Sequence, residues 1–357
     1  MGSSASRSPA DEPTTDTAEK ETILVVGGTG RTGSHLVRRL CDDEQRRFRV
    51  AVLARDPAKA SLLKETSWKG CDDVEVIEGD LGDVKAWENR LRGVSQIATA
   101  VSCGVRLFSN PLGILLPPNV ASFLGVVPPS NLPRTIDYKG MESLCTAARA
   151  ADVKRMVCVT TASTGTPFSA AAIFLNSVAA MSVKNKFLGE QAVRRSGLDY
   201  VIVRPFGLQD TAPLGGDTGL GISWTQGRTE GTRKRIPRAD VAAICHEALS
   251  LPHRSSSSSS GGGGSISISI SGDSISIVSN GSPGAVRTTF ECWATPDHQR
   301  RVPWGELRQE PPGSVADVDH DTAVAMGLGA VGAVCVGLGK GTGALARRLG
   351  LLRGIFK

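Results

Sequence analysis

The chain has 357 residues, of which 40% are hydrophobic and 21% are charged, as is ordinary for a soluble globular protein. This composition excludes a wholly disordered chain, a fibrous repeat and a multi-span membrane protein. The formal net charge is +6, but residues 340–357 contain five Lys and Arg residues and no acidic residue. Because the basic charge belongs to the end of the chain rather than to a face of the fold, we do not expect nucleic acid binding.

Residues 1–20 contain no Val, Ile, Leu, Phe, Trp or Tyr, and we predict that they are disordered. Gly2, followed by Ser at position 6, fits the N-myristoylation pattern, and a chance match in a Ser-rich segment is the alternative. The eight cysteines include no C-x-x-C pair, so we predict reduced thiols and no metal site. The five histidines are scattered and are interpreted as ordinary surface or helix residues rather than bases.

From Thr22 onward, short apolar runs alternate with helical patterns. This alternation predicts an α/β fold with a doubly wound parallel sheet of the Rossmann type, in a domain that spans residues 21–295. The predicted strands cover residues 23–26, 49–54, 74–77, 95–101, 155–160 and 200–203. The predicted helices cover residues 31–40, 135–151 and about 180–196.

The proline-rich segment 103–134 follows a predicted strand, so it is either a cover of the ligand crevice or a surface insertion. Residues 254–265 form a low-complexity insertion of Ser and Gly. Ser and Ile then alternate over residues 265–278 around Gly272-Asp273, which predicts a hairpin, and we expect this hairpin to pair with the main sheet. Residues 287–292 read as the last strand.

Two segments follow the domain. We expect residues 296–321 to be a linker and residues 322–357 to be an apolar and basic tail. Residues 322–339 carry no charge, and a stretch that is both basic and apolar follows them, as in segments that lie at the surface of anionic membranes. Membrane contact through residues 322–357 is one prediction, and packing of the tail on the domain is the alternative.

A glycine-rich motif, Gly27-Gly-Thr-Gly30-Arg-Thr-Gly33, lies between the first strand and the first helix. In dinucleotide-binding sites such glycines make a tight turn, let the backbone approach a pyrophosphate and let helix and strand pack closely. We therefore predict that this motif binds a dinucleotide, rather than only forming a tight turn between strand and helix. The predicted cofactor-binding residues here are Gly27, Thr29, Gly30, Arg31, Thr32 and Gly33.

Arg55 follows the second strand, where an NAD-selective site carries a carboxylate. A guanidinium group suits a 2′-phosphate, and Arg31 could join Arg55 there, so the sequence favours NADP(H) over NAD(H). Asp56 either binds a ribose or caps the helix that begins near Pro57.

At this point the chain resembles the atypical short-chain dehydrogenase/reductases, the NAD(P)-binding group around NmrA-like proteins and biliverdin reductase B. The likeness covers about residues 21–253 and the strand near residues 287–292. Its further motifs are Ala54-Arg-Asp56, Gly79-Asp-Leu81, Asp137-Tyr-Lys-Gly140, residues 153–159, Lys186-x-x-x-Glu190, residues 196–205 and residues 236–242.

The resemblance implies a set of residues around the cofactor. Asp80 and Leu81 would flank the adenine, and Ala100, Val101 and Ser102 would line the cofactor after the fourth strand. Thr160 and Thr161 would stand where relatives place Ser. The remaining implied residues border the nicotinamide and are Pro205, Phe206, Gly207 and Leu208, with Phe206 in place of a family Gly.

The Tyr-x-x-x-Lys pair of the wider superfamily is missing. Ser182 occupies the position four residues before Lys186. Two functions remain. In the first, the protein transfers hydride to an unidentified small-molecule acceptor such as a flavin or quinone, with Lys186 holding ribose or phosphate and Thr161 orienting the substrate. In the second, it is a non-catalytic NADP(H)-binding redox sensor or assembly scaffold attached to a membrane. Lys186 and Lys184 are alternatively a solvated helix face.

The acidic residues near the N-terminus favour a cytosolic location. The ends of the chain could associate the protein with a membrane there. A plastid location is the alternative, because plant relatives of this kind are often plastid proteins.

Overall fold

The computed structural model describes residues 20–45, 47–101, 132–214, 221–226, 233–252, 265–271, 274–280, 286–295, 307–311 and 319–324. Gly2, Ser102, residues 253–264 and residues 325–357 lie outside the described residues, as does the segment 102–131, which makes up most of the proline-rich stretch. The myristoylation and tail predictions, and most of the predicted insertion, therefore remain predictions.

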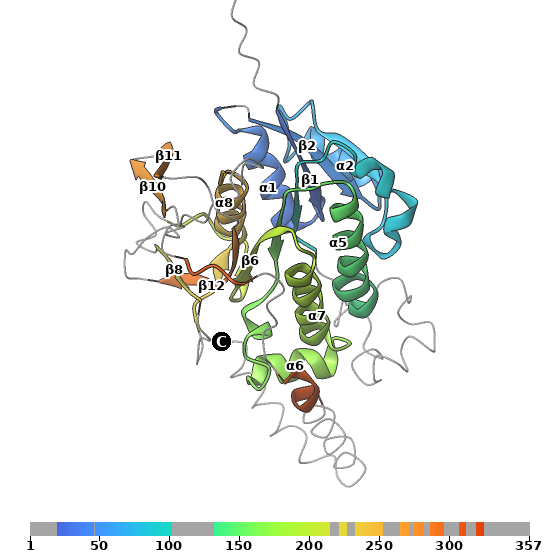
Figure 1. Cartoon of the computed structure of the whole chain (residues 1–357), viewed down its shortest axis with the longest axis vertical. Helices are drawn as coiled ribbons and strands as arrows, with labels where there is room; N and C mark the ends of the chain where they lie inside the picture. Colours follow the sequence, from blue (N-terminus) through green and yellow to red (C-terminus); the bar gives the residue numbers. More distant parts are fainter. Residues whose placement is uncertain are drawn as a thin grey trace, which may run out of the picture.

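Apolar runs form a sheet of eight strands in the order β3-β2-β1-β4-β5-β6-β12-β8 (Figure 1). All neighbours are parallel except β8, which is antiparallel to β12. This is the doubly wound Rossmann sheet that the sequence predicts. The strands are β1 (Glu21–Val26), β2 (Phe48–Ala54), β3 (Glu75–Glu78), β4 (Gln96–Thr99), β5 (Arg155–Val159), β6 (Asp199–Pro205), β8 (Gly221–Thr225) and β12 (Arg287–Thr295).

Helices cover both faces of this sheet (Figure 1). The longer ones are α1 (Arg31–Cys41), α2 (Pro57–Glu65), α5 (Met141–Ala150), α6 (Ala170–Val178), α7 (Ser182–Arg195) and α8 (Arg238–Leu249). The 3₁₀ segments among the described residues are η1 (Leu81–Ala86), η2 (Glu88–Leu91) and η5 (Ala162–Thr164). Arg134–Gly140 is a π-helical segment, η4, that continues directly into α5.

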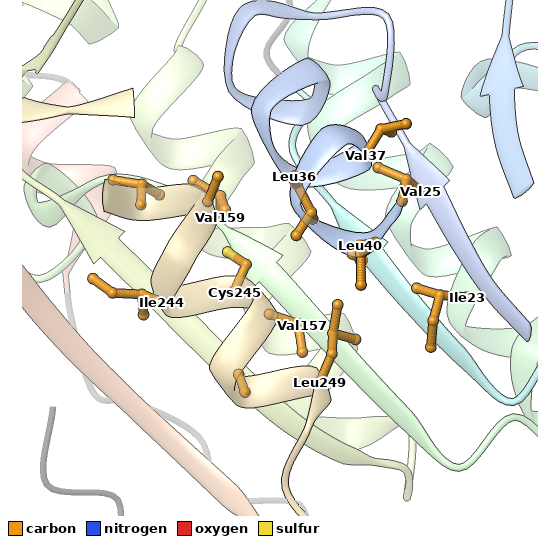
Figure 2. Packing of buried hydrophobic residues seen from close by; sticks show 14 of the residues in the cluster. Ile23, Val25, Leu36, Val37, Leu40, Val157, Val159, Ile244, Cys245 and Leu249 are labelled. Carbon is orange, nitrogen blue, oxygen red and sulfur yellow. The ribbon is translucent and has the colours of Figure 1, made fainter. Parts of the chain in front are cut away.

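The apolar faces of the helices divide the core into two clusters. On one face of the sheet, Leu36 and Leu40 of α1 pack with Cys245 and Leu249 of α8 (Figure 2). On the other face, side chains of α5 and α7, such as Leu144 and Val193, pack against the strands. Both faces are therefore buried, which is why the strands read as continuous apolar runs in the sequence.

The strand order reverses between β1 and β4, which are neighbours in the sheet. The connections that follow these two strands lead to opposite sides, so their carboxyl ends form a topological switch point. In open α/β sheets, ligands bind in the crevice at such a point.

One expectation about the second half of the chain is wrong. The hairpin β10 (Ser265–Ser271) and β11 (Ser274–Asn280) forms as predicted, but the described strands place it in a two-stranded sheet of its own. The main sheet has no free edge at β12 because β8 already pairs there. A third small sheet joins β7 (Leu208–Gln209) to β9 (Ile236–Pro237).

Two segments beyond the last strand pack on the domain. Leu307–Pro311 carries the buried Leu307, and Asp319–Val324 carries the buried His320 and Ala323. Residues 307–311 and 319–321 of the expected linker, and residues 322–324 at the start of the expected tail, therefore pack on the domain. Among the described residues, no helix has the length and apolar character needed to cross a membrane.

Candidate functional site

The glycine-rich turn sits directly against the end of β4. Gly27 has φ +84°, and a Cβ built on it would lie 2.8 Å from the carbonyl oxygen of Ala100. A Cβ on Gly33 would lie 2.2 Å from the carbonyl oxygen of Gly27. Only glycine fits at these two positions, because one needs a left-handed backbone and both lack space for a side chain.

The start of α1 fits the phosphates of a dinucleotide. The helix begins at Arg31, no side chain of the described residues caps it at Gly30, and its first turn has no acidic residue. Its first N–H groups therefore remain available to an anion, and the helix dipole favours one there. Thr32 is buried beneath this turn, and Thr29 is half-buried within it.

Arg55 and Arg31, which the sequence suggests could share a 2′-phosphate, point to different neighbours. Arg55 lies 3.9 Å from the Asp80 carboxylate, between the ends of β2 and β3. Arg31 forms an ion pair with Asp210 instead. Asp56 accepts hydrogen bonds from the N–H groups of Ala58 and Lys59, so among its two predicted roles the structure gives it the helix cap.

Lys186 of α7 forms a buried ion pair with Asp137 of the π-helical segment η4. Its Nζ lies 2.8 Å from Asp137 Oδ1 and 3.1 Å from the Val101 carbonyl oxygen. The Lys186 side chain is 11% exposed and that of Asp137 is 2% exposed. Lys186 is thus not the solvated helix face that was the alternative, because its charge is neutralised inside the fold.

The fold allows this pair because η4 and α7 approach closely. A Cβ on Gly189 of α7 would lie 2.1 Å from the carbonyl oxygen of Asp137. The glycine lets the π-helical backbone rest on α7 one turn from Lys186. The second carboxylate oxygen, Asp137 Oδ2, is buried and has no hydrogen-bond partner among the described residues. It is therefore available to accept a hydrogen bond from a ligand or a water.

A small cavity of about 20 Å³ connects this pair to a second carboxylate. Lys186, Asp137, Thr160 and Glu190 all contribute to its wall. Glu190 lies one helical turn after Lys186 on α7 and accepts hydrogen bonds from Thr160 Oγ1 at 2.6 Å and Thr164 Oγ1 at 2.8 Å. The Thr160 hydroxyl is therefore held by the protein, whereas the half-buried Thr161 hydroxyl has no partner among the described residues.

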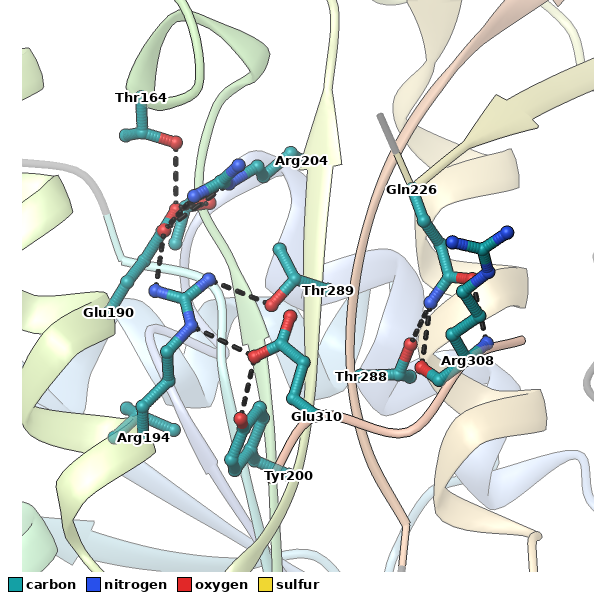
Figure 3. Close-up of polar contacts among 12 residues, drawn as sticks. Thr164, Glu190, Arg194, Tyr200, Arg204, Gln226, Thr288, Thr289, Arg308 and Glu310 are labelled. Atoms are coloured by element: carbon teal, nitrogen blue, oxygen red, sulfur yellow. Dashed lines mark hydrogen bonds and ion pairs between the residues drawn. The ribbon is translucent and has the colours of Figure 1, made fainter. Parts of the chain in front are cut away.

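Glu190 is the centre of a buried charge network (Figure 3). Arg204 of β6 binds its carboxylate through Nη2 at 2.5 Å and through Nε at 3.1 Å. Arg194 lies 3.3 Å away and also binds Glu310, whose carboxylate accepts a hydrogen bond from the Tyr200 hydroxyl at 2.7 Å. The segment around Glu310 is thereby attached to the sheet beneath the site.

The protonation of this network follows from its two cations. Burial alone raises the pKa of Glu190, but the charges of Arg204 and Arg194, together with hydrogen bonds, lower it to about 2. His320 lies on the far side, where Nε2 is 3.0 Å from the Thr164 carbonyl oxygen and the ring stacks on Phe187. Burial lowers the pKa of His320, so this histidine is a buried packing residue, not a surface one.

The other residues suggested by the family resemblance lie along the same edge. Leu81 is buried at the start of η1, and Ala100 follows β4 and donates its N–H to the Val26 carbonyl oxygen. Pro205 ends β6, and the Phe206 ring packs edge-on against Trp293 with ring centroids 5.8 Å apart. Gly207 and Leu208 lead into β7.

Sequence reasoning missed the residues that surround Lys186. Asp137 and Glu190 both occur in motifs shared with relatives, yet no role was assigned to them. Lys186 and Glu190 are four residues apart on one helix, a spacing that usually indicates a surface ion pair. Asp137 is 49 residues from Lys186 in the chain, and no local pattern connects the two.

A family model described as NAD(P)H-binding matches residues 27–252, which is more than half of the chain. The chain belongs to this NAD(P)H-binding family. The match confirms the family recognised from the glycine-rich motif and the motifs that follow it. Its limits include the glycine-rich turn, β4, Lys186 and Asp137, and they begin one residue after the end of β1.

Curated relatives are similar over the same region. An uncharacterized chloroplastic protein of Arabidopsis thaliana is 29% identical over 243 residues, covering 66% of this chain and 67% of the relative. The sanguinarine reductase of Eschscholzia californica is 27% identical over 254 residues, covering 66% of this chain and 86% of the relative. Protein TIC 62 of Arabidopsis thaliana is 28% identical over 202 residues, covering 54% of this chain but only 28% of the relative.

Among solved structures, a Bacillus halodurans protein described as an NAD-dependent epimerase/dehydratase superposes with a TM-score of 0.51. It is 16% identical, and the match covers 80% of this chain and 97% of that one. At this identity the likeness concerns the fold alone.

Proposed function

We propose that the protein is an NADP(H)-dependent oxidoreductase that transfers hydride to a flavin, a quinone or a similar planar acceptor without a Tyr-Lys catalytic pair. Membership of the NAD(P)H-binding family and the similarity to a relative named as a reductase support this proposal. The acceptor class follows from the chemistry: such acceptors take up hydride without the protonated tyrosine that carbonyl reduction uses.

The observation that carries the proposal is the buried Lys186–Asp137 pair at the carboxyl edge of the sheet. A lysine ammonium has three N–H donors. Asp137 Oδ1 and the Val101 carbonyl take two of them, which leaves one for a ligand oxygen. A held and oriented cation of this kind acts as a preorganised electrostatic group, because it needs little rearrangement when charge develops nearby.

The cofactor-holding residues would be the glycine-rich turn for the diphosphate and Lys186 for the ribose next to the nicotinamide. When bound, NADPH supplies a hydride. Reduction of the acceptor also requires one proton, which solvent would provide. The Lys186 ammonium, with its third N–H on the ribose, would stabilise negative charge on the acceptor through its electric field. Thr161, with its hydroxyl uncommitted among the described residues, would orient the acceptor.

The preference for NADP(H) over NAD(H) rests on Arg55. It stands where an NAD-selective site carries the carboxylate that binds a ribose 2′-hydroxyl, and it lies 3.9 Å from the Asp80 carboxylate. A 2′-phosphate would offer this exposed guanidinium a stronger, bidentate partner.

For the compartment, the plastid has better support than the cytosol. Five relatives are named as chloroplastic proteins, including the two from Arabidopsis thaliana described above. We propose a plastid location on that basis, and localisation of a fluorescent fusion of the full chain in plant cells tests it. Exclusion of the fusion from plastids would reject this part of the proposal.

The experiment that tests the activity measures NADPH oxidation by the purified chain against a panel of quinones and flavins, beside calorimetric binding of NADPH. We expect turnover with at least one acceptor, a loss of about 10-fold or more in kcat for Lys186→Met, and little change for Lys184→Met. Lys184 is a matched control on the same helix, paired with Asp321 away from the cavity. Binding of NADPH without any turnover would instead support a redox sensor or scaffold.

A further inference from the structure

A cluster of two arginines and one aspartate lies beside the glycine-rich turn. Asp210, which follows β7, forms an ion pair with Arg31 and lies 2.7 Å from Arg238 Nη1 through its other carboxylate oxygen. The two arginines are the first residues of α1 and α8. One carboxylate therefore bridges the beginnings of two helices.

The position of the two arginines is fixed by core packing rather than by this bridge. Helices α1 and α8 pack side by side through Leu36, Leu40, Cys245 and Leu249 (Figure 2). Their first residues are consequently held near each other whether or not Asp210 is present. Burial and the charge of Arg31 both lower the pKa of Arg238, which agrees with two guanidinium groups at short range.

The charge of the cluster is not balanced. Two guanidinium groups share one carboxylate, and the exposed fractions are 67% for the Arg31 side chain and 46% for Asp210. The Arg238 side chain is only 14% exposed, so its guanidinium is largely withdrawn from bulk water. A doubly charged anion would neutralise such a pair better than a single carboxylate does.

The cluster also lies where a dinucleotide would bring its phosphates, because Gly30 of the turn immediately precedes Arg31. Arg238 lies outside the glycine-rich motif, more than 200 residues further along the chain. Asp210 belongs to the segment that continues from the residues expected to border the nicotinamide. This segment is held at Leu214, whose N–H donates to the Asp240 carboxylate at 2.9 Å.

We propose that Arg238 is a cofactor-binding residue and that Asp210 is an internal substitute for a cofactor phosphate, which releases Arg31 and Arg238 when the dinucleotide binds. This inference rests on the proposed cofactor function. It adds that Asp210 competes with a cofactor phosphate for the two arginines. Binding would separate Asp210 from the two arginines and so would couple cofactor occupancy to the segment 208–214. A phosphate of the dinucleotide, either the diphosphate or the 2′-phosphate, is the ligand chemistry involved.

The test is calorimetric titration with NADPH and with NADH of the wild type, Asp210→Asn and Arg238→Met, at one low salt concentration. We expect Asp210→Asn to bind about 3- to 10-fold tighter, because two partly exposed ion pairs no longer compete. We expect Arg238→Met to bind at least about 10-fold more weakly. Asp42→Asn is the control, since it removes an exposed carboxylate at the opposite end of α1, where it pairs with Arg38.

The two cofactors distinguish the two phosphate sources. If both NADPH and NADH bind Asp210→Asn more tightly than the wild type, the proposal is supported and the two arginines bind the diphosphate. If only NADPH binds more tightly, the proposal is supported and the two arginines bind the 2′-phosphate. Unchanged or weaker binding by Asp210→Asn, or an equal gain in Asp42→Asn, would overturn the proposal, as would unchanged binding by Arg238→Met. If the folded wild type binds neither cofactor, the proposed function itself fails.

Discussion

Lys186 and Asp137 are an ion pair in the interior, with Nζ 2.8 Å from Oδ1 and both side chains nearly inaccessible to solvent. Asp137 belongs to η4 and Lys186 to α7, and these two segments approach closely because Gly189 of α7 has no side chain. The pair lies at the carboxyl edge of the sheet, next to the end of β4, where the Val101 carbonyl holds the same ammonium. We interpret this buried charge pair as part of the proposed site as well as of the packed interior.

Removing one partner of this pair should destabilise the fold strongly. We expect Asp137→Ala and Lys186→Met each to lower the free energy of unfolding by about 3 kcal/mol or more, because each leaves an unpaired buried charge. The double variant should lose clearly less than the sum of the two, by more than about 1 kcal/mol. Urea unfolding followed by circular dichroism measures all four proteins, and strictly additive losses would show that the two charges do not interact.

Gly189→Ala should disturb the same contact through the backbone. The new Cβ would lie 2.1 Å from the Asp137 carbonyl oxygen, so η4 must move away from α7. We expect the free energy of unfolding to fall by about 1–3 kcal/mol, as in other overpacked interiors. Gly207→Ala is the control, because its nearest neighbour is the flexible Arg235 side chain at 3.1 Å. Equal melting temperatures for the two variants would contradict the close approach of η4 and α7.

The Glu190 network predicts a particular pH dependence of stability. The pKa of Glu190 is about 2 in the folded chain against an ordinary value of 4.5. Because the folded pKa is the lower one, the stabilisation is complete above pH 4.5 and is lost as the pH falls towards 2. A shift of this size corresponds to about 3 kcal/mol.

Glu190→Gln should therefore be less stable than the wild type at neutral pH and should lose less stability between pH 4.5 and pH 2. Thermal unfolding across that range measures the difference. Glu75→Gln, which removes an exposed carboxylate paired with Arg90, should keep the wild-type pH profile. Parallel profiles for the wild type and Glu190→Gln would mean that the carboxylate does not hold a lowered pKa.

Arg55→Glu tests the cofactor preference. The substitution places a carboxylate where the proposal expects a 2′-phosphate, so NADPH should bind about 10- to 100-fold more weakly. NADH should bind as well as before or slightly better, because a carboxylate suits the 2′-hydroxyl of its ribose. Competitive displacement of a fluorescent nucleotide measures both affinities, and an equal loss for the two cofactors would reject Arg55 as the selective residue.

Much of the fold follows from local sequence patterns. The apolar run before Gly27 and the amphipathic run after Arg31 are enough to predict β1 and α1, and parallel strands buried on both faces appear as uninterrupted apolar runs. The strand β8 was not predicted, because its five residues contain only two apolar side chains, a pattern too short to indicate a strand without its partner β12. The hairpin of β10 and β11 was wrongly expected to pair with the main sheet, because a sequence does not show which sheet edges are already paired.

The candidate site likewise has one part that local sequence patterns predict and one part that they do not. The glycine-rich turn is local, and its chemistry can be derived from seven consecutive residues. The contacts of Lys186 with Asp137, of Glu190 with Arg204, and of Arg194 with Glu310 join separate segments that meet only after the sheet has formed. In the sequence, Lys186 looks like part of a charged, solvated helix face. In the folded protein it is a buried cation held in one position.

The most direct test of the central claim is calorimetric titration of the full chain with NADPH and with NADH, beside Gly30→Asp. Folding of the variant is checked by circular dichroism, with Arg55→Glu as a second variant that leaves the turn intact. The account predicts saturable NADPH binding that is tighter than NADH binding and is lost in Gly30→Asp, because a carboxylate at the start of α1 would repel the diphosphate. Failure of the folded wild type to bind either nucleotide would contradict it.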